Sequence, residues 1–147
     1  MSFKSVRTYL SSRLLEVDSD FENHSEPFSD ENIGDNDFNK RFHIFYGNVS
    51  TSLANQTSTQ DTVNATVALF FKGYASPQEA LDDAMDLANQ YRINCLRPKY
   101  LLTTPFIKRV TCTQITAEPL PTNDNAIKII LTFSINMIFG IGVNLDC

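Results

Sequence analysis

Apolar residues recur at three- and four-residue steps in two segments of the chain, which predicts two amphipathic helices. The first segment is residues 3–17. Arg13 lies within its apolar stripe, so this side chain must reach out to solvent or find a partner. The second segment is predicted to run to about residue 96. It begins with a capping box and a proline at the first helical position, in the run Ser76-Pro77-Gln78-Glu79.

Apolar and polar residues alternate in four other segments, which predicts strands at residues 40–47, 61–74, 107–117 and 127–139. The last two are separated by a turn rich in Pro, Asn and Asp, so we expect them to form an antiparallel hairpin. Residues 48–60 are rich in Asn, Ser and Thr. They are predicted to form either a long loop or the tip of an extended hairpin.

The expected order of elements is therefore α-β-β-α-β-β, an α+β fold. We predict a mixed or antiparallel sheet of four to five strands, with the helices packed on one face. The length of 147 residues fits a single domain spanning 1–147. Residues 18–39 form an acidic connector within it, and residues 140–147 either extend the last strand or form a C-terminal arm.

Charge is distributed unevenly along the chain, whose formal net charge is −5. Nine of the 17 acidic residues lie between Glu16 and Asp37, a stretch without Lys or Arg, and the rest of the chain has a small excess of bases. Three aromatic residues in or next to this stretch predict that it is pinned to the body at intervals: Phe21, Phe28 and Phe38. The negative net charge argues against a general nucleic-acid binder.

Candidate catalytic or metal-binding residues do not form a recognisable pattern. The three cysteines, Cys95, Cys112 and Cys147, include no C-x-x-C pair and are expected to be reduced thiols. Neither His24 nor His43 has a cysteine at ligand spacing, and the acidic run does not have the spacing of a calcium loop. We therefore expect neither an enzyme nor a cofactor or metal site.

Two further absences bear on where the chain works. The first residues lack the apolar run of a secretory signal, so we expect assembly in a cytoplasm. The longest nearly uncharged apolar stretch, Ile129 to Leu145, is too short and too polar for a transmembrane helix, so no membrane partner is expected. The uncharged polar segments and strand edges that remain suit protein–protein packing.

The order of elements resembles that of the tail terminator proteins of long-tailed bacteriophages, the group that includes the lambda minor tail protein U. The resemblance covers nearly the whole chain, as an order of elements without a diagnostic motif. It is carried by five features in sequence: the helix Ser5 to Val17, the acidic connector ending in the strand Arg41 to Gly47, the Asn/Ser/Thr-rich segment with the following strand Val63 to Phe71, the helix beginning at Ser76, and the closing hairpin.

The resemblance implies a structural virion protein of the tail or neck, assembled in the host cytoplasm, that forms a ring of six copies. Such a ring caps the tail tube, ends its polymerisation and joins it to head-tail connector or neck proteins. DNA passes through the lumen without specific binding. Alternatives are another phage neck or head-completion protein, and a monomeric ligand-binding or catalytic α+β domain, which would need a concave pocket.

Three sets of residues receive expected roles in such a ring. Negative charge would keep DNA from adhering to the lumen or rim, which assigns Glu31, Asp35 and Asp37 there. The uncharged polar segment is expected to reach a neighbouring ring, through Asn48, Leu53, Asn55 and Gln56. Apolar strand residues are expected at the subunit interface: Phe42, Phe45, Phe70 and Phe71.

Overall fold

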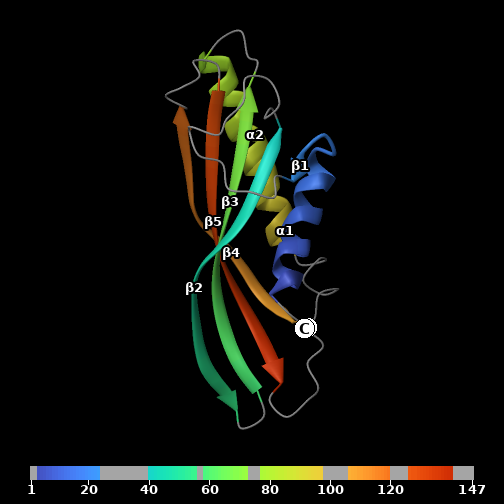
Figure 1. The fold of residues 1–147 in the computed structure, drawn as a ribbon, viewed down its shortest axis with the longest axis vertical. Helices are drawn as coiled ribbons and strands as arrows, with labels where there is room; N and C mark the ends of the chain where they lie inside the picture. The colour runs from blue at the N-terminus through green and yellow to red at the C-terminus, as the bar shows by residue number, and fades with distance from the viewer. Residues whose placement is uncertain are drawn as a thin grey trace.

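A computed structural model describes residues 3–23, 40–55, 58–72, 77–97, 106–119 and 126–140. Two helices and five strands lie in these ranges (Figure 1). In chain order they are α1 (Lys4–Val17), β1 (Glu22–Asn23), β2 (Arg41–Asn55), β3 (Ser58–Lys72), α2 (Pro77–Leu96), β4 (Ile107–Pro119) and β5 (Ala126–Gly140).

The strands form one mixed sheet in the order β1-β2-β3-β5-β4. β1 is parallel to β2, and the other three neighbouring pairs are antiparallel. This confirms the predicted α+β class and the two hairpins. The sequence did not predict β1, because two residues are too short to show an alternating pattern.

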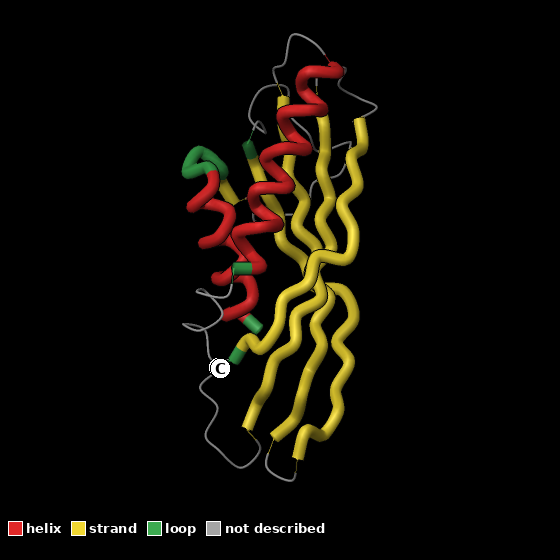
Figure 2. The backbone as a smooth tube through the Cα atoms, turned by 180° about the vertical axis from the view of Figure 1, so that it is seen from behind, coloured by secondary structure: helices red, strands yellow, loops and turns green. Residues whose placement is uncertain are grey.

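Both helices lie against one face of the sheet, and the strands continue past them (Figure 2). The side chains on this face come from alternate positions of β3 and β5 and are fully or almost fully buried. They include Val63, Ala65, Val67, Leu69 and Phe71 of β3, and Ile127, Ile129, Leu131, Phe133, Ile135 and Met137 of β5. The alternation predicted from the sequence is therefore the division between the core and the opposite face.

Three hydrogen bonds from side chains to backbone carbonyl oxygens join the two helices. The Tyr9 hydroxyl donates to the Cys95 carbonyl oxygen at 2.6 Å, and the Tyr91 hydroxyl donates to the Leu10 carbonyl oxygen at 2.9 Å. The Asn94 amide donates to the Arg13 carbonyl oxygen at 2.9 Å. The Arg13 guanidinium lies 5.1 Å from the Tyr9 ring centroid and pairs with Glu16, which gives this stripe residue its partners.

Residues 48–55 and 58–60 form the end of an extended hairpin, and the alternative of a long loop is wrong. Thr51 pairs with Asp61, Ser52 with Gln60 and Asn55 with Ser58. The same part of β3 also pairs with β5 on its other side, so its backbone groups have ladder partners on both sides in spite of the polar side chains. β5 continues to Gly140, and residues 141–147, with the predicted arm, lie outside the described residues.

The described start of the acidic connector is held to the body by paired charges and by one buried ring. The Lys40 ammonium lies 2.9 Å from an Asp18 carboxylate oxygen and 3.7 Å from one of Asp20, and Arg41 pairs with Glu22. Burial raises the pKa of Asp18, but the hydrogen bonds from Lys40 and from the Asp20 backbone outweigh it, so the pKa is lowered. These acids are therefore matched by bases at the other end of the connector.

Phe21 is the aromatic anchor of this segment. Its ring is 3% exposed and meets the rings of Phe42 and Phe71 edge-on, with centroid distances of 6.5 and 5.6 Å. This confirms the predicted attachment at Phe21. Phe28 and Phe38 lie outside the described residues.

Candidate functional site

A cluster of buried polar groups lies in the core between the helices. Burial raises the pKa of the Cys95 thiol, and the neighbouring charges change it less. Burial also raises the pKa of Tyr91 well above its usual value and that of Tyr9 to about 12. All three groups are therefore protonated at neutral pH and enclosed, which suits packing and hydrogen bonding rather than nucleophilic chemistry.

The burial of Cys95 predicts a difference in thiol reactivity between the folded and unfolded protein. We expect Cys95 to escape a water-soluble disulfide reagent in the native state and to react at once in denaturant, because the thiolate is the reactive form. Quantitative labelling followed by peptide mapping checks this. A Cys95→Ala variant serves as the control, because it should lose only the thiol exposed by unfolding. Native labelling of Cys95 at its unfolded rate would contradict the burial.

Metal-ligating side chains do not gather in the part of the chain that the structure describes. No group of three His, Cys, Asp or Glu residues there could hold an ion. His43 stacks on Phe45, with ring centroids 5.8 Å apart, and His24 lies outside the described ranges.

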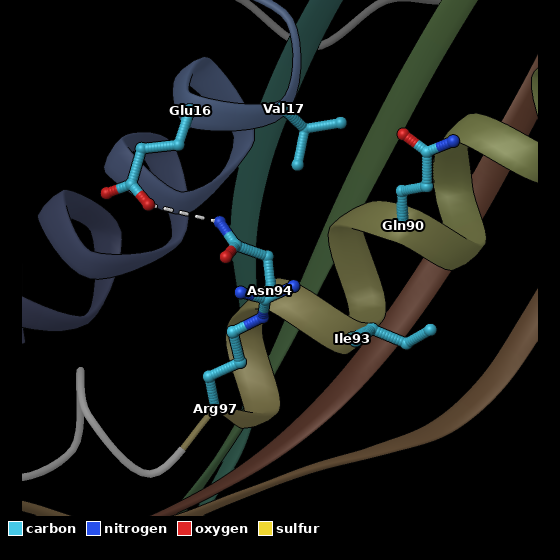
Figure 3. Close-up of a pocket in the computed structure, with 6 residues that line it drawn as sticks. All are labelled: Glu16, Val17, Gln90, Ile93, Asn94 and Arg97. Carbon is cyan, nitrogen blue, oxygen red and sulfur yellow. Dashed lines mark hydrogen bonds between the residues drawn. The ribbon is translucent and has the colours of Figure 1, made fainter.

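A groove with a volume of about 540 Å³ lies between the end of α1 and the second half of α2 (Figure 3). It is lined by Glu16, Val17, Gln90, Ile93, Asn94 and Arg97. Asn94 points toward α1, where it donates to a Glu16 carboxylate oxygen at 3.2 Å. The Asn94 amide is thus bonded to groups of α1 across the groove. The arrangement of the lining side chains does not point to a particular class of ligand.

The sheet face opposite the helices is the more distinctive surface. Cross-strand rows can be followed over it, and three successive rows of β3, β5 and β4 contain no Lys, Arg, Asp or Glu. The rows are Asn64–Ser134–Thr111, Thr66–Thr132–Gln114 and Ala68–Ile130–Thr116. Charged residues lie at the two ends of this polar face. Arg109 lies at one end. Lys128 and Glu118 lie at the other end and form an ion pair, with the Lys128 ammonium 3.5 Å from a Glu118 carboxylate oxygen.

Two hydroxyl groups on β4 and β3 donate hydrogen bonds to the neighbouring strand β5. The Thr113 hydroxyl donates to the Thr132 carbonyl oxygen at 3.2 Å, and the Thr62 hydroxyl donates to the Asn136 side-chain oxygen at 3.0 Å. None of the described helices covers the face (Figures 1 and 2). Its rows through Asn64 and Thr66 offer an uncharged, hydrogen-bonding surface of the kind used in protein contacts. Toward Lys128 the face is enclosed, because Ala68 and Phe70 on it are 6% and 2% exposed.

The predicted interface residues separate into two groups. Phe42, Phe70 and Phe71 are at most 2% exposed within one chain, whereas Phe45 is 44% exposed. Three of the four rings are thus enclosed by their own chain, and only Phe45 offers accessible area. The reason is partly the packing of Phe21 from the connector against Phe42 and Phe71, which no local pattern shows.

Only some of the other predicted site residues lie in the described ranges. Asn48 is exposed on β2, and Leu53 and Asn55 lie in the last part of the same strand. Gln56 and the proposed lumen residues Glu31, Asp35 and Asp37 lie outside the described residues.

Comparison with known proteins adds a likeness in fold. No protein-family model matches the chain, and no curated protein matches it in sequence. One similar solved structure is a virion. The matching chain belongs to the virion of a native gene transfer agent particle, with 9% sequence identity and a TM-score of 0.49. The match covers 88% of this chain and 92% of that chain.

Two features of the strands were not predicted from the sequence. Val49 is 45% exposed on β2, and Asp61 of β3 is 7% exposed, paired with Thr51 on one side and Met137 on the other. Extending the alternation of Val63, Ala65 and Val67 backwards by one step would have placed Asp61 on the buried face.

None of the described helices is long and apolar enough to cross a membrane.

Proposed function

We propose that the protein is a structural subunit of a tailed-phage virion. In this proposal it forms a ring, with six copies, that caps the tail tube, ends tube polymerisation and joins the tail to head or neck proteins. The observation that carries the proposal is the two-sided sheet. One face is closed by helices over an apolar core, and the other carries uncharged polar side chains along its middle and has no described helix over it.

An enzyme fits these surfaces less well than an assembly subunit. The buried thiol and phenols are held protonated inside the helix pair, and the groove beside them is spanned by an internal hydrogen bond. The exposed polar side chains lie instead in long rows along strands. Such rows can be buried against another protein without leaving a buried charge unpaired.

The extended hairpin of β2 and β3 is the part proposed to reach a neighbouring ring. Its strands run past the helices (Figure 2). The sequence from Phe42 to Gln60 contains no Asp, Glu, Lys, Arg or Pro. A rigid paired hairpin loses less conformational freedom on docking than a loop of the same length. The proposed lumen role of Glu31, Asp35 and Asp37 rests on charge alone: like charge keeps DNA from adhering.

The test is tube capping with a shortened hairpin. Residues 53–59 are replaced by Asn-Gly between Ser52 and Gln60, which pair with each other and so can be joined by a two-residue turn. We expect unchanged ring mass by light scattering and a loss of capping, seen as overlong tubes in electron micrographs of tail assembly reactions.

The matched control keeps the full hairpin and replaces only Thr57, by Gly. It should cap as the wild type does. Normal capping by the shortened variant would remove the hairpin from the mechanism. A wild-type chain that leaves tube length unchanged would overturn the proposed function as a whole.

A further inference from the structure

The sheet has two open edges among the described residues. β1 pairs only with Arg41 and Phe42, so β2 has no described neighbouring strand on that side from Ile44 to Asn55. At the other end of the sheet, β4 pairs with β5 alone. An open edge presents unpaired backbone N–H and C=O groups that can pair with a strand of another chain.

The β2 edge lacks most of the features by which natural sheets block such pairing. Charged residues, proline and β-bulges are common devices. Between Phe42 and Gln60 there is no Lys, Arg, Asp, Glu or Pro, and irregularities in register lie between Tyr46 and Val49 and between Leu53 and Asn55. Between these two irregularities, from Val49 to Leu53, the described edge is uncharged and open to pairing.

Apolar side chains on both faces of β2 add to this edge. Phe45 and Val49 are 44% and 45% exposed. Phe45 lies opposite Thr66 on the polar face, and Val49 lies opposite the buried Val63 on the helix face. A strand added along β2 would cover part of both side chains, which gains hydrophobic stabilisation on each face.

The β4 edge is blocked at its ends and open in its middle. Lys108 and Arg109 stand at its start, next to an irregularity in register, and Glu118 and Pro119 stand at its end. Between them, Val110 to Ala117 carries no charge, although a second irregularity lies between Cys112 and Gln114. The edge can therefore accept a partner over this central stretch only.

The two edges run in opposite directions. β2 is antiparallel to β3, β3 to β5, and β5 to β4, so β4 is antiparallel to β2. When a second copy is set beside the first in the same orientation, its β4 meets the open edge of β2 in the antiparallel sense. Copies in a cyclic ring share one orientation, so this contact repeats until the ring closes.

We propose that copies of this chain join by strand addition, with the open edge of β2 of one copy pairing with Val110 to Ala117 of β4 of the next. The sheets then continue from subunit to subunit, and no charged side chain is enclosed at the middle of the seam. The inference rests on the proposed ring, for which it names the contact between neighbours. Pairing of β2 with β2 of another copy would instead produce a two-fold dimer that cannot grow.

The first experiment places a lysine in the uncharged middle of each edge strand. Ser50→Lys on β2 and Thr113→Lys on β4 are expected each to reduce the ring to monomers in light scattering, because a lysine on an edge opposes strand addition. Gln60→Lys is the matched control. Gln60 is exposed on the polar face like Ser50, but it lies on β3, which has neighbours on both sides. The control should keep the ring mass.

The second experiment separates the two pairings by cross-linking. Ser50→Cys and Thr111→Cys place exposed thiols on the polar face of the two edges, in a background of Cys112→Ser and Cys147→Ser. With a short bismaleimide, we expect a ladder of products beyond the dimer when both thiols are present. Each thiol alone should give no product.

The outcomes decide the inference separately from the function. Dimers from Ser50→Cys alone, or a ring that survives both lysine variants, would overturn the β2–β4 contact while leaving the ring intact. A wild-type chain that is monomeric at every concentration but still caps tubes would also overturn it. A wild-type chain that neither associates nor caps tubes would contradict the ring function as well.

Discussion

Phe133→Ala is expected to lower the free energy of unfolding by about 3–5 kcal/mol, the cost of a large cavity in a packed core. Phe133 is fully buried near the middle of β5. Its ring meets the Tyr91 ring edge-on at a centroid distance of 5.8 Å, which joins the sheet to α2. Domains of this size are stable by roughly 5–15 kcal/mol, so the variant should lose a large fraction of its stability.

Urea denaturation followed by circular dichroism measures this difference. Phe45→Ala is the matched control, because it removes the same ring from a side chain that is 44% exposed. Its effect on the isolated chain should stay within about 0.5 kcal/mol. Equal losses in the two variants would mean that Phe133 does not occupy the packed position between the sheet and α2.

Asp61→Val is expected to raise the free energy of unfolding by about 1–3 kcal/mol, the usual cost of a buried polar group without a partner. Asp61 is 7% exposed, and its Oδ1 atom has no hydrogen-bond partner among the described residues. It lies on the helix-side face of the sheet next to Met137, with the buried Val63 two positions along. A β-branched apolar residue suits this strand position better than a carboxylate.

The matched control is Gln60→Val at the neighbouring position. It makes a similar change on an exposed side chain, so its effect should remain within about 0.5 kcal/mol. Thermal and urea unfolding of both variants gives the comparison. A loss of stability in Asp61→Val would show that the carboxylate makes a favourable contact in the native state.

The regular elements were largely predictable from residues near one another in the chain. The capping box at Ser76 to Glu79 predicts the start of α2, and the period-two pattern of Ile127 to Ile135 predicts β5. Both signals are local, because a helix cap and a strand alternation depend on spacing alone. The sequence left two structures open for the hairpin tip. Its Asn, Ser and Thr residues are equally compatible with a loop, and pairing with β5 decides between them.

The candidate site depended on contacts between distant segments. Phe42 and Phe45 look alike in the sequence, but Phe21 from the connector helps to enclose Phe42 and leaves Phe45 exposed. The paired charges Lys40 with Asp18 and Arg41 with Glu22 likewise join the two ends of the connector across the sheet edge. No local pattern contains such information, because the partners are about twenty residues apart and meet only through the fold.

The sequence by itself determined the helices, the strand alternation and hence the α+β class, since each follows from the spacing of apolar residues along a backbone of fixed geometry. The tertiary structure alone decided the order β1-β2-β3-β5-β4, and with it which edges stay open, which phenylalanines are enclosed and which carboxylate is buried. These properties depend on which strands become neighbours. That choice is made by the packing of whole faces against each other, and not by the order of residues within any one strand.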